Sequence, residues 1–517
     1  MIDTQSKSRS IQIGHRVQVQ DQIGTVKYIG ELDGHKGTWL GLDWDDPSRG
    51  KHDGSVKGIQ YFTASTSTSG SFVRLEKVSV GINLIDSITS RYGHQEDEEE
   101  MKYNQVAFMA LEHQCNMPFL ELVGFDGIST KQSNYPELKV LTVRMMNVAH
   151  LGDTHQFSLM CPNVEEFDLS KNMIHSWEEV FVLASELKHL HNLNICENRL
   201  VMPADISSYK VPHLKTLICG TMTLSMAEIE SLALVFPNLQ TLIAPYNQIR
   251  SLESTLPLET LFHRLEALDL EGNKISDWSE IMKLKHLPNL KNLNLINLQL
   301  TKIRIEEDNV FKSLNTLNLK NNQIADLESL SNLNKLSLTA LGISRNPIYN
   351  LDTHQMVNQI IVAMISSLQV LNGGTILDER KGAEIDYMKK YGLEWLQVQK
   401  DEEAKTKFLQ THTRYQEFIE KMGELEESEL KHEAKTIKES LIELNLVYEG
   451  KEIRKKVPPS LQVQKLVTLC QRLFRLSTAP ALVYISIEQP NIEYDLDENR
   501  EISLYSVQTG DKIVVKC

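Results

Sequence analysis

One nine-residue pattern, LxxLxLxxN, returns at nearly constant spacing through the middle of the chain and constrains its fold more than any other feature. Clear copies begin at residues 164, 190, 239, 265, 314 and 338, weaker copies begin at 138, 214 and 290, and successive copies start 24 to 26 residues apart. A fixed period of this length is typical of a solenoid, in which each repeat is one structural unit stacked on its neighbours. We therefore expect each copy to contribute one short parallel strand whose fourth and sixth residues point into a shared core.

The pattern is that of the leucine-rich repeat fold, an α/β solenoid. Its ninth position carries an Asn, whose amide can bond to the backbone of the turning loop. Met146, Met222 and Leu298 take its place in three copies, so we expect those turns to be looser or bonded differently. The similar segments SWEE (176–179) and DWSE (277–280) predict the starts of helices on the convex side.

A stacked array needs its two ends covered. Residues 368–395 resemble a C-terminal cap, and LELVGFDGI at 120–128 is a candidate early copy for the other end. The third, fifth and seventh positions should line the concave face, where such solenoids usually bind. Acidic residues there are Glu166, Asp168, Asp269 and Glu271, and the apolar residues expected to stand exposed side by side are Ile218, Ile243 and Pro245. Exposed apolar neighbours usually mark a partner surface, although a neighbouring domain could equally cover them.

The first part of the chain has a different pattern. Short β-branched runs at 16–19 and 24–29 alternate with Asp-Gly, Gly-His and Gly-Lys turns, which indicates a compact all-β domain. The motif Gly-Lys-His-Asp-Gly at 50–54, the preceding WLGLDWDDPSR and the later GSFVR are similar to the CAP-Gly domain. This resemblance implies a small β-barrel that grips the extreme C-terminus of a partner chain, in particular an acidic tail ending in an aromatic residue, such as that of α-tubulin.

The resemblance and the residue chemistry together predict a tail-binding site. The glycines permit close approach of a ligand backbone, Lys51 can meet a carboxylate as a point charge, and the rings can seat an aromatic end group. The candidate residues are Trp39, Gly50, Lys51, His52, Asp53, Gly54, Phe62, Phe72 and Arg74. We assign Trp44 and Tyr61 to the core of the domain. His52 stands where the commonest family motif has Asn, and we expect it to be solvated.

Composition limits the remaining possibilities. At 517 residues the chain needs several domains. Its formal charge of −15 argues against general nucleic-acid binding, and no apolar run approaches the roughly 20 residues that span a bilayer. The N-terminus lacks the apolar core of a signal peptide. The six cysteines show no CxxC pair, so we expect reduced thiols in the cytosol and no zinc site. Without a Walker loop, HExxH or GxSxG, we expect no enzyme activity and no cofactor.

The chain after the repeats divides into two further parts. Residues 396–440 are rich in Glu, Lys and Gln with apolar residues at helical spacing, which predicts a charged helical spacer. Alternating strands and one amphipathic helix in residues 441–517 resemble an α+β ubiquitin-like fold. This part ends at Lys516-Cys517 without a Gly-Gly tail, so we expect a docking module. We therefore divide the chain into a CAP-Gly domain (11–80), an acidic linker (81–115, with the run 94–100), leucine-rich repeats with their cap (116–395), the spacer (396–440) and the ubiquitin-like domain (441–517).

This domain order is rare and is similar to that of the tubulin-folding cofactor E family of tubulin-specific chaperones. The resemblance implies binding of α-tubulin and a role in assembling, or dissociating, the α/β-tubulin heterodimer. The implied partners are cofactors B, C and D with β-tubulin and, through the ubiquitin-like domain, the proteasome. It also implies a cytoplasmic, cytoskeleton-associated protein. Two alternatives remain: a microtubule-tip adaptor and a ubiquitin-pathway adaptor.

Overall fold

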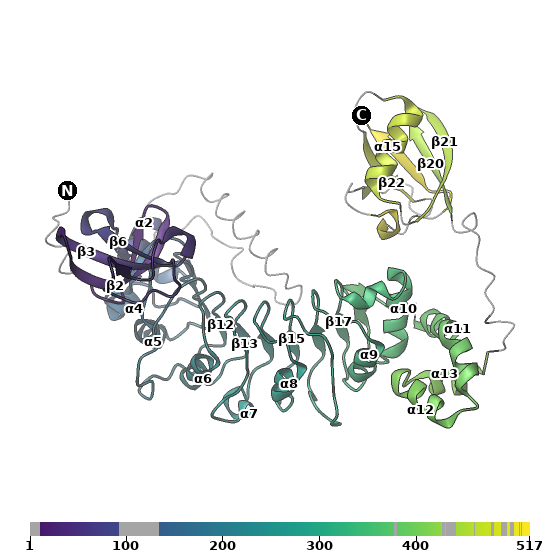
Figure 1. Ribbon diagram of the computed structural model, residues 1–517, viewed down its shortest axis with the longest axis horizontal. Coiled ribbons are helices and arrows are strands. Elements are labelled where there is room, and N and C mark those ends of the chain that lie inside the picture. The colour runs from purple at the N-terminus through teal and green to yellow at the C-terminus, as the bar shows by residue number, and fades with distance from the viewer. Residues whose placement is uncertain are drawn as a thin grey trace. The chain divides into compact units, whose positions relative to one another are not determined.

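The computed structural model describes residues 11–92, 134–376, 380–425, 430, 441–459, 461–476, 480–486, 494–496, 501–505, 507 and 509–516. The chain divides into two compact units, Met1–Glu424 and Leu425–Cys517 (Figure 1). The acidic run at 94–100, the candidate early copy at 120–128 and most of residues 426–440 lie outside the described residues.

The N-terminal domain is an antiparallel sheet with the strand order β1-β2-β3-β6 and a small separate hairpin, β4-β5. The strands are β1 (Arg16–Val19), β2 (Gln22–Leu32), β3 (His35–Trp44), β4 (Ser55–Val56), β5 (Ile59–Gln60) and β6 (Gly70–Arg74). One face of the sheet packs Val26, Leu40, Leu42 and Trp44 into a core. Trp44 is 1% exposed, which confirms its assignment to the core.

The repeats form one long sheet in which neighbouring strands follow chain order. The strands are β8 (Val140–Thr142), β10 (Glu166–Asp168), β11 (Asn192–Asn194), β12 (Thr216–Ile218), β13 (Thr241–Ile243), β14 (Ala267–Asp269), β15 (Asn292–Asn294), β16 (Thr316–Asn318), β17 (Ala340–Gly342), β18 (Val370–Leu371) and the antiparallel β19 (Gly374–Thr375). From β8 to β18 every pairing is parallel. Each copy of the pattern thus contributes one parallel strand, as predicted.

Helices lie along one side of this row of strands (Figure 1). They are α4 (Thr154–Met160), α5 (Trp177–Glu186), α6 (Met226–Val235), α7 (Leu258–Leu261), α8 (Trp278–Ile281), α9 (Leu327–Leu333) and α10 (His354–Met364). Ser176 accepts a hydrogen bond from the backbone at the start of α5, and Asp277 does so at the start of α8. The Trp that follows each cap is buried, which confirms the two predicted helix starts.

The Asn of each repeat ties neighbouring turns together. In Asn247, Nδ2 donates to the carbonyls of Cys219 (2.8 Å) and Ala244 (3.2 Å), and Oδ1 accepts from the amides of Met222 (2.9 Å) and Leu224 (3.2 Å). The turn at Met222 therefore keeps its bond to the next repeat although it lacks its own Asn. Its side chain is buried instead, at 3% exposure, so this turn is bonded differently, as predicted, rather than left without partners.

The expected exposure of the concave face is wrong. Asp168, Asp269 and Ile243 are 0%, 2% and 3% exposed, and Glu271 is buried as well. Ile243 lies in register between Ile218 on β12 and Asp269 on β14, and strands about 4.8 Å apart let adjacent side chains cover one another. Ile218 and Pro245, like Glu166, are half-buried. The apolar residues are neighbours, as predicted, but they do not form an open patch.

Three helices close the far end of the repeats: α11 (Arg380–Val398), α12 (Glu402–Thr411) and α13 (Tyr415–Met422). Arg380 on α11 donates to the carbonyls of Val362 (2.8 Å) and Ile365 (3.1 Å) at the end of α10. Phe408 and Phe418 are buried in this cluster. The first part of the predicted spacer, as far as Met422, therefore packs as part of the repeat unit.

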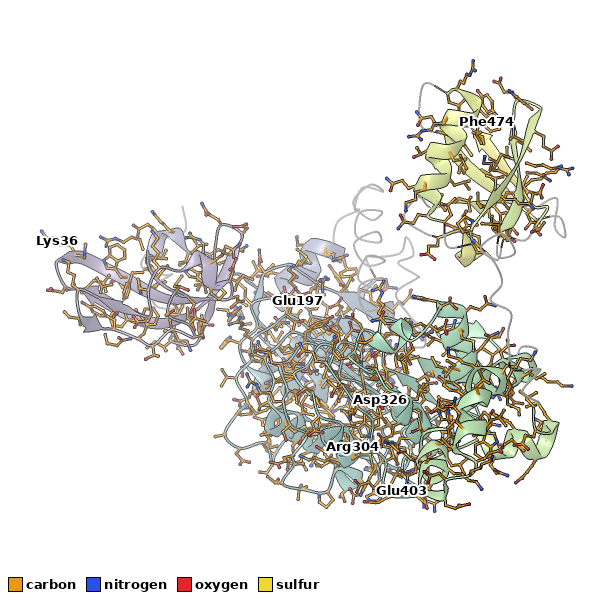
Figure 2. All side chains as sticks on the ribbon, turned by 45° about the vertical axis from the view of Figure 1, so that its right-hand side comes forward. Lys36, Glu197, Arg304, Asp326, Glu403 and Phe474 are labelled. Carbon is orange, nitrogen blue, oxygen red and sulfur yellow. The ribbon has the colours of Figure 1, made fainter. Side chains whose placement is uncertain are left out.

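The N-terminal domain joins the repeats through direct contacts. The short strand β7 (Ile82–Asn83) pairs in parallel with β9 (Val148–His150), and the helix α2 (Leu84–Tyr92) follows it. The amide of Thr142 on β8 donates to the hydroxyl of Tyr92 (2.9 Å). Residues 82–92 of the predicted linker thus form a strand and a helix against the first repeats. Glu197, labelled in Figure 2, pairs with Arg144 in the same region (2.9 Å).

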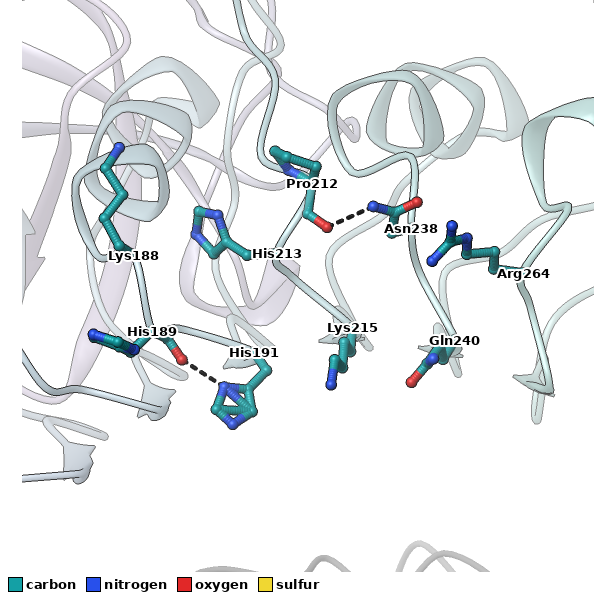
Figure 3. A pocket seen from close by; sticks show the side chains of 9 residues that line it. All are labelled: Lys188, His189, His191, Pro212, His213, Lys215, Asn238, Gln240 and Arg264. Carbon is teal, nitrogen blue, oxygen red and sulfur yellow. Dashed lines mark hydrogen bonds between the residues drawn. The ribbon is translucent and has the colours of Figure 1, made fainter.

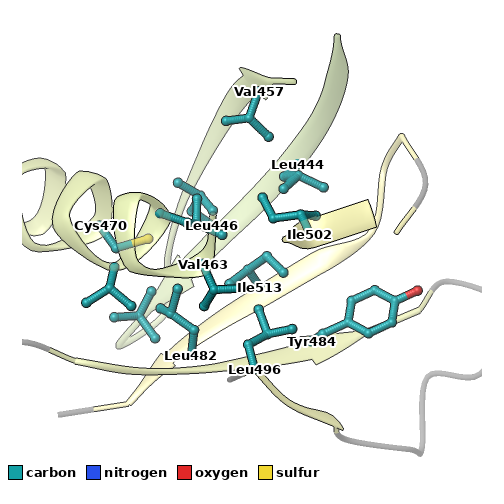
Figure 4. Close-up of a cluster of buried hydrophobic side chains, with 13 residues drawn as sticks. Leu444, Leu446, Val457, Val463, Cys470, Leu482, Tyr484, Leu496, Ile502 and Ile513 are labelled. Carbon is teal, nitrogen blue, oxygen red and sulfur yellow. The ribbon is translucent and has the colours of Figure 1, made fainter. Parts of the chain in front are cut away.

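The second unit is a five-stranded sheet in the order β21-β20-β24-β22-β23. Its elements are β20 (Ile442–Tyr448), β21 (Lys451–Val457), α15 (Val463–Phe474), β22 (Ala481–Ile485), β23 (Tyr494–Asp495) and β24 (Lys512–Lys516). The first and last of its strands pair in parallel at the centre. Leu446, Leu482 and Ile513 of the sheet pack around Cys470 of the helix (Figure 4). The topology agrees with the predicted ubiquitin-like fold.

Candidate functional site

The loop at 50–54 is held against the start of β6 by its backbone. The amide of Lys51 donates to the carbonyl of Gly70, and the amide of Gly70 donates to the carbonyl of His52, both at 2.7 Å. A Cβ on Gly50 would lie 2.0 Å from the carbonyl oxygen of Thr68. Gly50 is therefore required by the packing of this loop against residues 68–70, before any ligand is considered.

A buried carboxylate holds the second loop. Asp43 is 3% exposed and accepts hydrogen bonds from the hydroxyls of Ser65 (2.5 Å) and Ser69 (2.7 Å) and from the amide of Ser65. Because Asp43 lies in β3, these bonds fix the 65–69 loop to the central sheet. The loop in turn fixes the position of the 50–54 motif.

Gly54 occupies the left-handed region with φ +102°, and a Cβ there would lie 2.0 Å from the carbonyl oxygen of Phe62. The carboxylate of the preceding Asp53 accepts from the amide (3.0 Å) and hydroxyl (2.5 Å) of Ser55. These bonds hold the pKa of Asp53 below its usual range. The Asp53 carboxylate thus stabilises its own turn, and Gly54 brings that turn against Phe62.

Rings from four segments gather on the sheet face opposite the core, and we call this cluster the aromatic face; its residues are Tyr28, His52, Tyr61, Phe62 and Phe72. Phe72 lies at the centre, with ring centroids 5.2 Å from His52, 5.4 Å from Tyr61, 5.5 Å from Phe62 and 6.1 Å from Tyr28. Most of these contacts are edge-to-face, the arrangement that the ring quadrupole favours.

Gly41 makes this cluster possible. Tyr28, Gly41 and Phe72 are in register across β2, β3 and β6, so their side chains share one face. A Cβ on Gly41 would lie 2.5 Å from the Phe62 ring. The Phe62 ring therefore packs in the space that a side chain at position 41 would fill, and Phe62 is 7% exposed.

His52 is part of the aromatic face and is not solvated as expected. Its ring stacks on Phe72 with an interplanar angle of 28°, and its Nδ1 accepts a hydrogen bond from the amide of Gly54 (3.0 Å). Burial lowers the pKa of His52, and the nearby Asp53 opposes the shift. An Nδ1 that accepts a hydrogen bond leaves Nε2 as the protonated nitrogen of a neutral ring.

Two cations border the rings. Arg74 lies two residues beyond Phe72 on β6, and its guanidinium carbon is 3.9 Å from the centre of the Trp39 ring, a cation–π contact. Trp39 and Arg74 are paired in register on the same face as Phe72. Lys51 is exposed and directly precedes His52. The arrangement offers ring faces for an aromatic group beside positive charge for a carboxylate.

The structure brings together most of the predicted site. His52, Phe62 and Phe72 form one cluster, Trp39 and Arg74 extend it, and Lys51 adjoins it, whereas Gly50, Asp53 and Gly54 shape the loop. Tyr61 was wrongly assigned to the core: it is half-buried on the aromatic face, and its hydroxyl accepts from the amide of Asp33 (3.0 Å). Tyr28 was missed, because the strand pairing that places it opposite Gly41 contains an irregularity between Val26 and Tyr28.

Known proteins match both this region and nearly the whole length of the chain. Residues 13–78 match the family model of the CAP-Gly domain, and this segment includes the whole aromatic face. Tubulin-specific chaperone E of Bos taurus is 35% identical to this chain, with 99% of each chain covered. Those of Homo sapiens and Drosophila melanogaster are 33% and 31% identical, with 98% of each chain covered. The chain belongs to the tubulin-specific chaperone E family.

Two solved structures resemble its ends. One is the C-terminal ubiquitin-like domain of mouse tubulin-specific chaperone E, at 28% identity over 15% of this chain and 86% of that one, with a TM-score of 0.14. The other is the CAP-Gly domain of Bik1 with an ETF peptide from Bim1, at 32% identity over 15% of this chain and 94% of that one, with a TM-score of 0.12. Within the described residues, no helix has both the length and the apolar character to cross a membrane, and no group of His, Cys, Asp and Glu could hold a metal ion.

Proposed function

We propose that this protein is a tubulin-folding cofactor that binds α-tubulin and takes part in assembly or dissociation of the α/β-tubulin heterodimer. Membership of the tubulin-specific chaperone E family over nearly the full chain supports this role. The observation that carries the proposal is the CAP-Gly segment, in which the 50–54 loop adjoins the aromatic face.

The chemistry of that region fits an acidic tail that ends in an aromatic residue. The terminal ring packs against Phe72 and its neighbours, because each ring presents an edge or a face to a further ring. Lys51 and Arg74 attract the carboxylates as charges, and backbone N–H groups complete the capture of the chain end. The protonated Nε2 of His52 supplies one further donor.

The repeats then provide a second contact. We propose that they are a leucine-rich repeat solenoid whose concave face meets the tubulin body or partner cofactors. Ile218 and Pro245 are the accessible apolar residues of this face, and the buried Ile243 lies beside Ile218 on the next strand. Holding the tail raises the effective concentration of the tubulin body near this face. Cofactors B, C and D, with β-tubulin, are the proposed further partners.

The proposed mechanism is binding without covalent chemistry, in the cytoplasm and in association with the cytoskeleton. The ubiquitin-like unit serves as a docking module that connects the protein to the proteasome. Two alternative functions are a microtubule-tip adaptor and a ubiquitin-pathway adaptor. Co-sedimentation with microtubules without binding to soluble tubulin would favour the microtubule-tip adaptor. Proteasome binding that depends on residues 441–517, without heterodimer assembly, would favour a ubiquitin-pathway adaptor.

The first test is binding of the full chain to soluble tubulin heterodimer, following the α and β subunits separately. Tubulin with and without the C-terminal aromatic residue of the α subunit is compared, and Lys51→Ala is compared with the parent chain. Lys77→Ala is the matched control, because Lys77 is an exposed lysine of the same domain outside the aromatic face. We expect removal of the aromatic residue and Lys51→Ala each to weaken binding, and Lys77→Ala to leave it unchanged.

Each outcome has a clear meaning. Unchanged binding after tail removal would contradict capture by the aromatic face and assign the main contact to the repeats. Absence of any binding to soluble tubulin would contradict the chaperone function and leave the adaptor functions.

A further inference from the structure

A row of side chains marks the points where the repeat strands begin. We call the residues that directly precede strand β8 and strands β10 to β15 the strand-start row; they are Lys139, Glu165, His191, Lys215, Gln240, Glu266 and Lys291. Backbone bonds hold them in order, since the amide of Thr216 donates to the carbonyl of His191 (2.8 Å) and that of Thr241 to the carbonyl of Lys215 (3.0 Å). Successive members therefore follow the strand spacing of about 4.8 Å.

Charge is balanced at both ends of this row but not in its middle. Lys139 pairs with Glu165, and Lys291 pairs with Glu266, each at 2.7 Å between Nζ and a carboxylate oxygen. Among the residues that the structure describes, no carboxylate pairs with Lys215, which lies between these two pairs. Lys215 is exposed, so its charge faces solvent.

A hollow of about 290 Å³ opens beside Lys215 (Figure 3). Pro212, Asn238 and Gln240 supply its neutral wall. Its other lining residues are all basic and are Lys188, His189, His191, His213, Lys215 and Arg264. We call this the basic hollow. Among the described residues no carboxylate is part of this lining, although Glu165 lies 3.9 Å from His191. Since the formal charge of the chain is −15, the hollow is a local concentration of basic side chains on an acidic protein.

Two histidines of the basic hollow, His191 and His213, have ring nitrogens close to backbone carbonyl oxygens. Nε2 of His213 lies 3.0 Å from the carbonyl oxygen of Ala184, and Nδ1 of His191 lies 2.5 Å from that of His189, so these ring nitrogens are placed to donate. Burial lowers the pKa of His191, and the nearby Lys215 lowers it further. The carboxylate of Glu165, 3.9 Å from Nε2 of His191, opposes this lowering. The positive charge of the hollow therefore rests on its lysines and arginine rather than on His191.

We propose that the basic hollow docks an acidic polypeptide segment of a partner protein, through charge complementarity along the strand-start row. The cations of the hollow come from three repeats: Lys188 lies between α5 and β11, Lys215 directly precedes β12, and Arg264 lies two residues before Glu266 of the strand-start row. A single small anion needs donors that converge on one point, whereas a chain with several carboxylates can meet cations arranged in a line. This site lies outside the CAP-Gly segment and does not depend on tail capture there.

Binding of an octaglutamate peptide, labelled with fluorescein and amidated at its C-terminus, tests the proposal by fluorescence anisotropy. The full chain carries Lys51→Ala throughout, so that the CAP-Gly loop contributes little. We expect Lys215→Gln with Arg264→Gln to raise the Kd by about tenfold or more at low salt, because two cations that line the basic hollow are lost.

The matched control is Lys139→Gln with Lys291→Gln, which removes the same amount of charge at two other positions of the strand-start row but takes it from existing ion pairs. We expect the control to change the Kd by less than about threefold, since only its long-range field is altered. Equal losses in the two variants would overturn the proposal by showing a general charge effect. No binding, or unchanged binding in Lys215→Gln with Arg264→Gln, would also overturn it. Complete competition by millimolar inorganic phosphate would assign the hollow to small anions instead.

Discussion

The N-terminal domain and the repeat sheet hold the loops at the ends of their strands by different kinds of contact. In the N-terminal domain, contacts that occur once hold each loop: Gly50 fits against residue 68, and Gly54 fits against Phe62. In the repeats, one Asn contact recurs from turn to turn, as at Asn172, Asn247 and Asn322.

This contrast predicts which parts of the chain a substitution should affect. A single-copy contact has no substitute, so its loss should abolish one local geometry and leave the rest of the chain unchanged. A repeated contact belongs to a stack in which stability depends on each unit and its nearest neighbours, so its loss should spread along the array. Four substitutions test this contrast.

We expect Gly54→Ala to have the largest effect. It combines a positive φ with a Cβ only 2.0 Å from the Phe62 carbonyl, so the loop must move and the aromatic face must open, at a cost of more than about 3 kcal/mol locally. Peptide-level hydrogen exchange should accelerate in residues 70–74 and not in 267–294, and tail binding should be lost. Gly58→Ala is the control, because its φ is also positive (+81°) but its Cβ would meet nothing within 4 Å; equal effects of the two would contradict the steric argument.

Asn247→Ala should destabilise the repeats by about 3 kcal/mol, because it leaves buried backbone donors and acceptors of two turns unpaired. Urea unfolding measures the loss, and hydrogen exchange should accelerate on both sides of the substituted turn. Arg250→Ala, at an exposed position in the same loop, should have little effect. Acceleration confined to residues 244–249 would remove the contrast between the two regions.

Asp269→Asn should stabilise the repeats by about 2 kcal/mol at pH 8 and not at pH 4. Burial raises the pKa of Asp269 to about 7, whereas the unfolded chain releases this proton near pH 4. Between these values the folded state holds more protons, so its stability falls as pH rises. Asn removes that loss and can still accept from the amide of Glu271, as Asp269 does at 2.7 Å.

Urea unfolding at the two pH values measures this effect, with the exposed Glu306→Gln as the control. A pH-independent gain would show that Asp269 is not the group that titrates. Asp43, the buried carboxylate of the N-terminal domain, accepts hydrogen bonds from two hydroxyl groups, whereas Asp269 accepts one from a backbone amide. The result would therefore show how differently the two regions hold a buried acid.

The smallest effect is expected for Arg199→Ala. The side chain of Arg199, in the repeats, pairs with Asp45 of the N-terminal domain. Nε of Arg199 lies 3.2 Å from Oδ1 of Asp45, and both side chains are about a third exposed. Pairs of this kind contribute less than about 1 kcal/mol, and Asp45 keeps its partner Arg16. A double-mutant cycle with Asp45→Asn measures the coupling. A coupling well above this value would show that the two regions unfold as one.

Much of the repeat architecture could be read from the printed residues. The spacing of the pattern predicted the strands, and the two Trp-containing segments predicted the starts of α5 and α8. These features depend on contacts within a repeat or with the next repeat, so local order determines them. The glycines and rings of the CAP-Gly segment likewise indicated most members of the site.

Other features required the folded chain. The burial of Ile243 and Asp269 depends on how closely neighbouring strands let side chains cover one another, which a pattern of positions does not contain. Tyr28 and Tyr61 joined the aromatic face because a strand irregularity and a loop brought them to Phe72. The docking of α12 and α13 also depends on a surface made by residues distant in the chain.

The repeat period, the domain order and the chemistry of the 50–54 loop follow from the printed residues alone, because each depends on residues that are close together in the chain. The folded chain was needed to show which side chains meet across Gly41 and which acids are buried. It was also needed to show that, among the described residues, Lys215 of the strand-start row pairs with no carboxylate. Those outcomes depend on registers and distances between segments that are far apart in sequence, where a shift of one residue exchanges one face of a strand for the other.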